Sequence, residues 1–214
     1  MTVTDVNVVK SAIFERPDDA NKGTLGSLLC VCGSYGMAGA AVMSAKGALR
    51  TGIGLAKCAL PRSIYPIVAQ TILESVYYPL SENADGRISK VNVPFLVSES
   101  CKSSATLVGC GLGVCDDTLK IVFSLIENST TPLVLDADAL NCVAKQPEIL
   151  LRKKAPIIIT PHPGEMSRLT GLATPLVNAE RERVALDFAQ KYGVVTVLKG
   201  AGTVIASPNG TVLV

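Results

Sequence analysis

The only histidine in the chain stands in a short polar segment with the composition of a ligand-binding loop. Residues 160–165 read T-P-H-P-G-E and follow three isoleucines, a run typical of a strand buried on both faces. The prolines beside His162 cannot donate ladder hydrogen bonds, so the strand ends there and the chain stiffens. Ligands of open α/β sheets bind at such strand ends, which makes His162 and Glu165 candidate binding residues. A lone histidine is also compatible with a purely structural role.

Two carboxylates stand two positions apart after another predicted strand. Asp136 ends the apolar run 132–136, Asp138 follows, and Asn141 comes about one helical turn later. An extended chain would put both carboxylates on one face, where they could hold a hydrated magnesium ion or a ligand hydroxyl. Alternatively, Asp138 caps the helix that begins with D-A-L-N. The sequence leaves both interpretations open.

Two glycine-containing segments have the composition of phosphate-binding turns. Residues 33–39, G-S-Y-G-M-A-G, join a predicted strand to a helix whose N-terminal amides favour anions. Their spacing differs from the dinucleotide fingerprint, and a tight turn explains them equally well. Residues 199–203, K-G-A-G-T, offer an ammonium group, backbone amides and a hydroxyl to a nucleotide phosphate. They lack the order of a P-loop, and a plain hairpin turn is the alternative.

Other classes of site are disfavoured. A serine hydrolase of the G-x-S-x-G type needs a nucleophile elbow that the chain lacks, and the loop around His162 offers too few nitrogen or sulfur ligands for catalytic zinc. The seven cysteines are an odd number without a C-x-x-C pair, and most lie in apolar runs. We expect them to be reduced and buried rather than paired or metal-bound.

The candidate segments are positioned by an alternation of strands and helices. We expect strands at 27–32, 55–60, 74–80, from 105 onward, at 132–136 and at 157–160, and helices at 38–50, 63–71, from 116 or 117 onward, at 139–144, 165–169 and 178–192. Residues 194–198, 203–206 and 211–214 predict an antiparallel meander at a sheet edge. Residues 81–89 have turn composition and predict a surface loop remote from catalysis. This order favours one mostly parallel, three-layer α/β domain.

Composition and charge narrow the class of protein further. With 214 residues, 48% of them hydrophobic and 18% charged, the chain can form one large domain with a sizeable core. A net charge of +2 without a lysine- or arginine-rich block argues against nucleic acid as a partner. No apolar run approaches membrane-spanning length, and the first ten residues lack the pattern of a secretion signal. We therefore expect a cytoplasmic protein without a membrane partner.

Six segments together resemble one enzyme family. In chain order they read K-G-T-L-G (22–26), G-M-A-G-A-A (36–41), G-C-G-L-G (109–113), L-D-A-D-A-L-N (135–141), T-P-H-P-G-E (160–165) and V-L-K-G-A-G-T-V-I-A (197–206). In this order and spacing they resemble the ADP/ATP-dependent NAD(P)H-hydrate dehydratases. The resemblance implies a ribokinase-like, three-layer α/β/α domain over residues 1–214, with a mostly parallel sheet and an antiparallel C-terminal edge.

The resemblance also implies an activity. Members restore NADH or NADPH from the hydrated forms NADHX and NADPHX, in a carbon-oxygen lyase reaction that repairs a damaged metabolite. ADP, or less often ATP, phosphorylates the hydroxyl group of the hydrated ring, and phosphate then leaves. A magnesium ion is expected with the nucleotide, since phosphoryl transfer needs charge neutralisation. A tetrameric homo-oligomer is the implied assembly.

The resemblance assigns roles to nine positions. Ala40, Gly111 and His162 match residues that contact the hydrated dinucleotide. The stretch that binds the adenosine nucleotide is matched by Lys199, Gly200, Ala201, Gly202 and Thr203. Glu165 matches the acid that organises metal and phosphate, directly or through water.

One departure from the family pattern qualifies these roles. In the family a G-[GS]-x-G-D motif follows the antiparallel segment and supplies the anion hole and the catalytic aspartate, and the 214 residues contain no such motif. We therefore expect a domain truncated at its C-terminus and a 214-residue chain that is inactive or nearly so by itself. The alternatives are a ribokinase-like small-molecule kinase, which transfers phosphate without elimination, and a non-catalytic nucleotide-binding module.

Overall fold

A computed structural model describes residues 23–214 of the chain. The N-terminal residues used above, including Lys22 of the first motif, lie outside this range. The strands are β1 (Ser27–Val31), β2 (Leu55–Pro61), β3 (Val76–Leu80), β4 (Ala105–Val108), β5 (Leu133–Leu135), β6 (Ile157–Ile159), β7 (Val195–Leu198), β8 (Val204–Ala206) and β9 (Val212–Leu213). The α-helices are α2 (Ala38–Arg50), α3 (Tyr65–Thr71), α4 (Val93–Cys101), α5 (Asp116–Asn128), α6 (Asp138–Val143), α7 (Pro163–Thr170), α8 (Thr174–Ala179) and α9 (Arg181–Tyr192). Three 3-10 helices, η1 (Arg62–Ile64), η2 (Lys90–Asn92) and η3 (Pro147–Arg152), complete this part of the chain.

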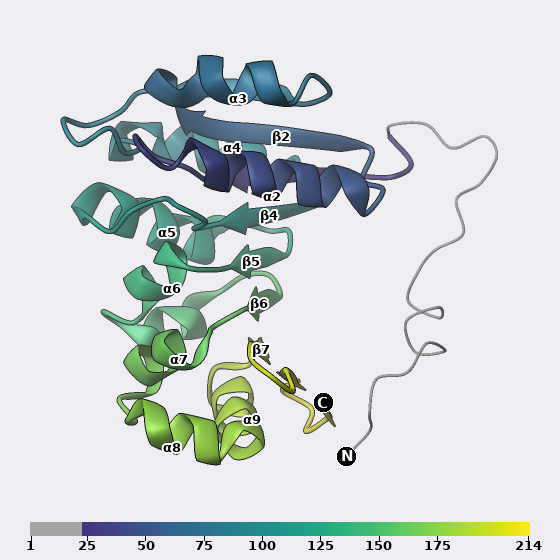
Figure 1. The fold of residues 1–214 in the computed structure, drawn as a ribbon, viewed down its shortest axis with the longest axis vertical. Helices are drawn as coiled ribbons and strands as arrows, with labels where there is room; N and C mark the ends of the chain where they lie inside the picture. Colours follow the sequence, from purple (N-terminus) through teal and green to yellow (C-terminus); the bar gives the residue numbers. More distant parts are fainter. Residues whose placement is uncertain (1–22) are drawn as a thin grey trace.

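The strands of the described residues form one nine-stranded sheet in the order β3-β2-β1-β4-β5-β6-β7-β8-β9 (Figure 1). The seven strands from β3 to β7 are parallel, and β8 and β9 follow antiparallel at the edge. This confirms the predicted parallel sheet and its antiparallel C-terminal edge. Because β1 lies between β2 and β4, the chain reverses its direction of growth there. Such a switch point opens a crevice at the carboxyl ends of the two diverging strands.

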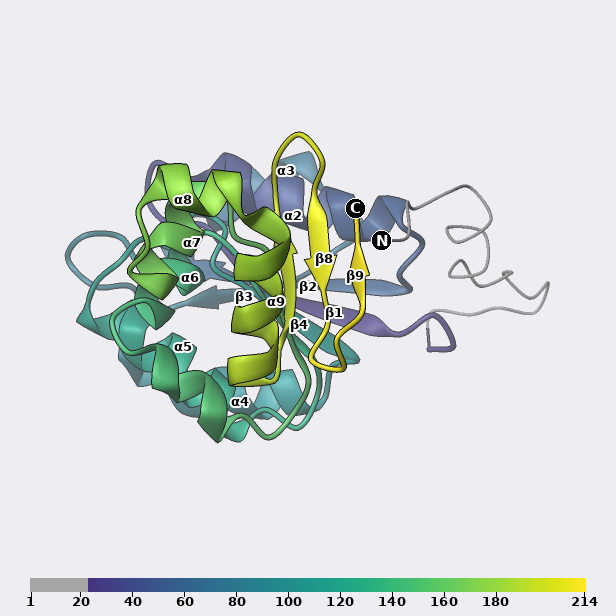
Figure 2. The ribbon, with the colours of Figure 1, turned by 90° about the horizontal axis from the view of Figure 1, so that it is seen from below.

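Helices cover the two faces of the sheet unequally (Figure 2). The helices α4 to α9 pack on the face that carries Leu29, Val108 and Ile159. Small residues of α2, such as Ala41 and Ala45, let that helix lie close to the opposite face, over Cys30 and Cys58. Together α2 and α3 cover only the first strands, since Ile158 on the same face of β6 is 36% exposed.

Three elements differ from the sequence-based expectation. Helix α4 was not expected, because its nine residues begin next to a proline and show no clear helical period. The helix expected at 178–192 begins later, since Asn178 lies inside α8 and the chain breaks at Glu180 before α9 begins. The loop 81–89 is not wholly exposed, because Ile88 is fully buried and pairs with Glu82 in an isolated β-bridge. No helix of residues 23–214 is long and apolar enough to cross a membrane.

Candidate functional site

The switch point between β1 and β4 brings two predicted substrate-binding residues together. Gly33 donates its N–H to the Cys110 carbonyl over 2.8 Å, and the Ser34 hydroxyl donates to the Gly111 carbonyl over 2.8 Å. These bonds hold the turn after β1 against the turn after β4. Gly111 has φ 64°, and a Cβ atom there would lie 2.7 Å from the Ala40 Cβ. Gly111 is therefore packed directly on the first turn of α2, next to Ala40.

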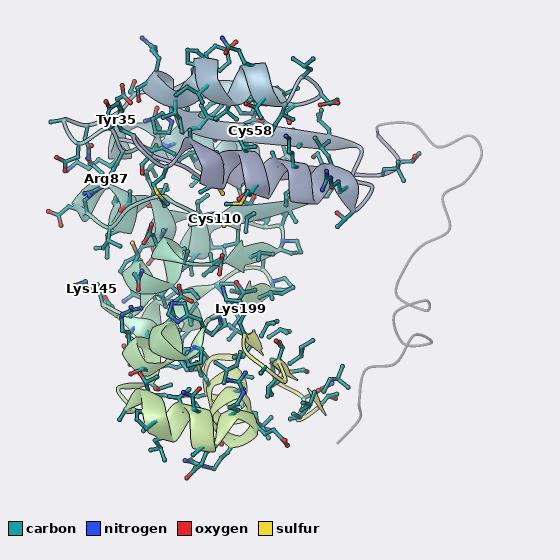
Figure 3. The ribbon with its side chains drawn as sticks, viewed as in Figure 1. Tyr35, Cys58, Arg87, Cys110, Lys145 and Lys199 are labelled. Carbon is teal, nitrogen blue, oxygen red and sulfur yellow. The ribbon has the colours of Figure 1, made fainter. Side chains whose placement is uncertain are left out.

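The loop 81–89 lies against the turns that follow β1 and β4, in the region where Figure 3 labels Tyr35 and Arg87. Tyr35 donates its N–H to the Gly86 carbonyl over 2.8 Å, and its own side chain is 73% exposed. The Arg87 guanidinium donates to the Val114 carbonyl over 3.4 Å and packs on the backbone of Gly113. The loop thus lies beside the predicted substrate contacts, a neighbourhood that the sequence did not indicate for it. Its turn composition predicts exposure but contains no signal for which turns it adjoins.

His162 and Glu165 form the capping box of α7. The His162 Nδ1 accepts from the N–H groups of Gly164 and Glu165 over 3.0 and 3.3 Å, and the Glu165 Oε2 accepts from the His162 N–H over 2.8 Å. Glu165 is buried, and its Oε1 lies 3.4 Å from the His162 Nε2. The His162 side chain remains 51% exposed, so one edge of the ring is open to a ligand. The prolines fix a loop whose histidine both caps a helix and faces solvent.

Asp136 at the end of β5 is the centre of a polar network across four strands. Its Oδ1 accepts from the Lys199 ammonium over 2.6 Å and from the Thr160 hydroxyl over 2.7 Å. Its Oδ2 accepts from the Cys110 thiol over 3.5 Å. Burial by itself would raise the pKa of the Asp136 carboxyl, but hydrogen bonds from Lys199 and Thr160 and the lysine charge outweigh it and lower the pKa. Asp136 is thus an ionised anchor for the predicted nucleotide-binding lysine.

The two carboxylates after β5 do not share a face, because the chain turns between them. Ala137 has φ 50° and ψ −114°, and the Ala139 N–H bonds the Asp136 carbonyl over 3.1 Å, so the four residues form a tight turn of type II′. Asp138 Oδ2 accepts from the Gly113 N–H over 2.8 Å, and Oδ1 accepts from Asn141 over 3.2 Å. Asp138 is neither a partner of Asp136 nor the helix cap, which is Ala137. Instead it fixes the turn after β4.

Residues 199–203 form the turn between β7 and β8. The Lys199 N–H donates to the Pro161 carbonyl over 2.8 Å, which ties this turn to the His162 loop. Thr203 closes the turn through its hydroxyl, which donates to the Gly200 carbonyl over 3.1 Å. Gly200, Ala201 and Gly202 are exposed, and a cavity of about 590 Å³ beside them is lined in part by Ala201, Gly202 and Val204. The turn therefore presents backbone to an open hollow, whereas the Lys199 ammonium is held by Asp136.

A bound metal ion and reactive buried cysteines find little support in the described residues. Between residues 23 and 214, no three His, Cys, Asp or Glu side chains come together in an arrangement that could hold a metal ion. All seven cysteines are free; Cys101 is exposed and Cys110 and Cys115 are half-buried. Burial raises the pKa of the Cys142 thiol to about 11, and it raises that of Cys58, so both thiols are poor nucleophiles.

The structure therefore places most of the predicted site residues at the carboxyl ends of the parallel strands. Ala40 and Gly111 meet at the switch point, and His162 and Lys199 lie on the loops after β6 and β7, which hydrogen-bond to each other. Four participants were not singled out from the sequence: Thr160, Cys110, Gly113 and Arg87. Thr160 and Cys110 do follow predicted strands, and this position was the available signal. No sequence signal indicates the long-range partners of the other two.

Comparison with known proteins agrees with the family resemblance of the sequence motifs. A family profile described as NAD(P)H-hydrate dehydratase matches residues 28–214. The bifunctional NAD(P)H-hydrate repair enzyme Nnr of Thermofilum pendens is 40% identical over 195 residues, which cover 91% of this chain and 37% of that protein. The ADP-dependent (S)-NAD(P)H-hydrate dehydratase of Neisseria meningitidis is 32% identical over 202 residues, covering 93% of this chain and 64% of that protein.

A solved structure shows the same arrangement of elements. The ADP/ATP-dependent NAD(P)H-hydrate dehydratase of Bacillus subtilis, co-crystallised with ATP and Mg²⁺, superposes with a TM-score of 0.81 at 29% identity. The match covers 99% of this chain and 71% of that one. The chain thus spans less than two-fifths of the bifunctional relative from Thermofilum and about two-thirds of the single-function relatives.

Proposed function

The chain belongs to the NAD(P)H-hydrate dehydratase family, and we propose that its protein converts NADHX and NADPHX into NADH and NADPH at the expense of an adenosine nucleotide. The fold is ribokinase-like. One observation supports the proposal most directly. The turn at Gly111, the loop of His162 and the turn 199–203 all lie at the carboxyl ends of parallel strands of a single sheet. A dinucleotide and a nucleotide can therefore meet there.

The proposed reaction removes the elements of water from the hydrated nicotinamide ring in two steps. The ring hydroxyl gives up its proton and attacks the terminal phosphoryl group of the nucleotide, the bond from that phosphorus to the bridging oxygen breaks, and AMP leaves from ADP, or ADP from ATP. A hydroxyl, which is a poor leaving group, is thereby replaced by a phosphate, which is a good one. The C–O bond then breaks, inorganic phosphate leaves, and loss of a ring proton restores the reduced ring. The described residues supply binding and orientation for these steps, and the family's glycine-rich motif with its aspartate is expected to supply the base.

Each loop of the candidate site has a proposed role. The backbone at Gly111 and the first turn of α2 hold the hydrated dinucleotide in the switch-point crevice, and the exposed edge of the His162 ring contacts it from the other side. Lys199 and the turn 199–203 hold the nucleotide phosphates. Asp136 Oδ1 keeps the Lys199 ammonium in place over 2.6 Å, and the Thr160 hydroxyl orients that carboxylate by donating to the same oxygen over 2.7 Å. ADP is the favoured donor, because the named Neisseria relative is ADP-dependent.

Magnesium is proposed as an ion carried by the nucleotide. Both oxygens of Glu165 lie close to His162, and an oxygen of Asp136 is held by Lys199, so these carboxylates do not form a ready ligand set. Magnesium usually keeps several waters and binds through phosphate oxygens, which fits this edge better than an all-protein site. When bound, the ion would neutralise phosphate charge. Glu165 would act on it through water.

The same proposal includes a cytoplasmic location and a tetrameric assembly, both implied by the family resemblance.

A small-molecule kinase is the alternative function, because it needs the same phosphate turn. The two functions differ in their products: a kinase leaves a phosphorylated alcohol, whereas the dehydratase releases one phosphate for each reduced nicotinamide ring. The segment T-P-H-P-G-E, with its half-exposed histidine, favours the dehydratase. Nucleotide binding without turnover by the full-length protein would support the non-catalytic alternative.

Substitution of His162 tests the assignment of the substrate loop. His162→Asn keeps a side-chain acceptor for the first N–H groups of α7, whereas His162→Ala removes both cap and ring. If the ring contacts substrate, both variants of the full-length protein raise the KM for NADHX several-fold, and only the alanine variant also loses stability, by about 1 kcal/mol. The measurements are initial rates over a range of NADHX concentrations and thermal unfolding. An unchanged KM in the alanine variant would remove His162 from the site.

A further inference from the structure

Arg181, the first residue of α9, lies beneath the turn 199–203. Its Nη2 donates to the Leu198 carbonyl over 2.8 Å and to the Gly202 carbonyl over 3.2 Å. These carbonyls belong to the two stems of the turn. A single guanidinium group thus bridges the strand that enters the turn and the residue near its exit, which fixes the width of the turn.

The contact between Arg181 and Gly200 shows that the fit is close. A Cβ atom at Gly200 would lie 2.8 Å from both Nη1 and Nη2 of the arginine, so the guanidinium plane lies directly against the Gly200 backbone. Gly200 has φ 155°, a value that few other residues adopt. The glycine therefore serves two purposes, since it allows the turn conformation and leaves room for the arginine.

The charge of Arg181 is not neutralised by any carboxylate among the described residues. Its neighbour Glu180 forms an ion pair with Arg183 instead, and Arg183 also pairs with Asp187. The Arg181 Nε is buried and has no hydrogen-bond partner within residues 23–214. Arg181 as a whole is half-buried, and it lines the hollow together with Glu180, Glu182 and Arg183. Because Glu180 is paired with Arg183, the Arg181 charge beside the open turn is free to attract an anion.

We propose that Arg181 is the positioning residue of the nucleotide site, holding the turn 199–203 in its binding conformation and adding positive potential beneath it. Arg181 also lines the cavity of about 590 Å³ beside the turn. This inference rests on the proposed nucleotide role of residues 199–203. Arg181 makes no hydrogen bond to the switch-point turns or to the His162 loop among the described residues, so we expect its main effect to be on nucleotide binding.

Nucleotide titration of Arg181 variants of the full-length protein tests the inference. Arg181→Met keeps an unbranched apolar stem but removes both carbonyl contacts and the charge, and we expect it to weaken ADP and ATP binding about tenfold or more in calorimetric titration. The KM for NADHX should change less than about twofold. Arg181→Lys should fall between wild type and Arg181→Met, because an ammonium can reach only one of the two carbonyls. Arg152→Met, which removes an exposed arginine paired with Glu127, is the matched control.

The possible outcomes separate the two proposals. If the wild-type protein binds neither nucleotide, the proposed function fails. If the wild type binds and Arg181→Met binds equally well, or loses affinity for NADHX by the same factor, the role of Arg181 is refuted. Circular dichroism verifies folding of each variant, and if Arg181→Met does not fold, Arg181→Lys decides: undiminished nucleotide affinity in that variant would overturn the inference.

Discussion

Asp136 shows how a single side chain connects the loops of the candidate site. The carboxylate follows β5 and receives hydrogen bonds from Lys199 after β7, Thr160 after β6 and Cys110 after β4. Each donor comes from a neighbouring strand end, so this anchor fixes where the lysine can meet a phosphate. Because the bonds favour the charged form, the Asp136 pKa lies below its ordinary value even though burial opposes this.

Replacement of the Asp136 carboxylate should cost stability in a pH-dependent way. A pKa lowered in the folded state stabilises the fold above the unfolded pKa of about 3.9, and the contribution is lost as pH falls through the folded value. We expect Asp136→Asn to reduce the free energy of unfolding by about 1–3 kcal/mol at pH 7. Urea unfolding of both proteins between pH 7 and pH 3 should show the difference shrinking towards the acid end. A difference that does not change with pH would contradict the charged network.

At the scale of elements, periodicity and turn residues were enough to predict the parallel strands and most helices. The continuous β-branched run 157–159 does form a strand, but it is buried on one face only, since Ile158 between two buried isoleucines is 36% exposed. Two kinds of feature were not predictable. Helix α4 is short and lacks a clear apolar stripe, and the partners of Arg87 and Arg181 come from loops far away in the chain. Long-range pairing depends on the register of the whole sheet, which a local pattern does not encode.

The packing of α2 on the turn after β4 makes a prediction at Gly111. An alanine there places its Cβ 2.7 Å from the Ala40 Cβ and 3.0 Å from the Met37 Cβ, so the first turn of α2 must move. We expect Gly111→Ala to lose about 2–4 kcal/mol of stability, from overpacking and from the left-handed backbone, and to raise the KM for NADHX.

The matched control for stability is Gly36→Ala. Gly36 has a similar positive φ of 82°, but nothing lies within 4 Å of an added Cβ, so only the backbone cost of about 1–2 kcal/mol should appear. Chemical unfolding of the two variants isolates the cost of the contact. Equal losses would show that α2 does not rest tightly on the turn of Gly111.

At the scale of the whole molecule, the binding residues implied by the family resemblance all lie at the carboxyl ends of the parallel strands. The switch point lies between β1 and β4, and the nucleotide turn lies three strands further along, after β7. Neighbouring strands lie about 4.8 Å apart, so the two regions are separated by roughly 15 Å, a span suited to a dinucleotide and a nucleotide that meet end to end. The antiparallel β8 and β9 extend the sheet beyond the nucleotide turn, where Figure 1 shows them at the C-terminal edge.

The most direct test of the proposed function is turnover of the hydrated cofactor by the full-length protein. NADHX is mixed with the protein and Mg²⁺, with ADP, with ATP or without nucleotide, and the absorbance of the reduced nicotinamide ring and the release of inorganic phosphate are followed together. We expect NADH to form only when a nucleotide is present, with one phosphate released per NADH. Phosphorylated NADHX that accumulates without NADH, or NADH formation that does not depend on nucleotide, would contradict the account.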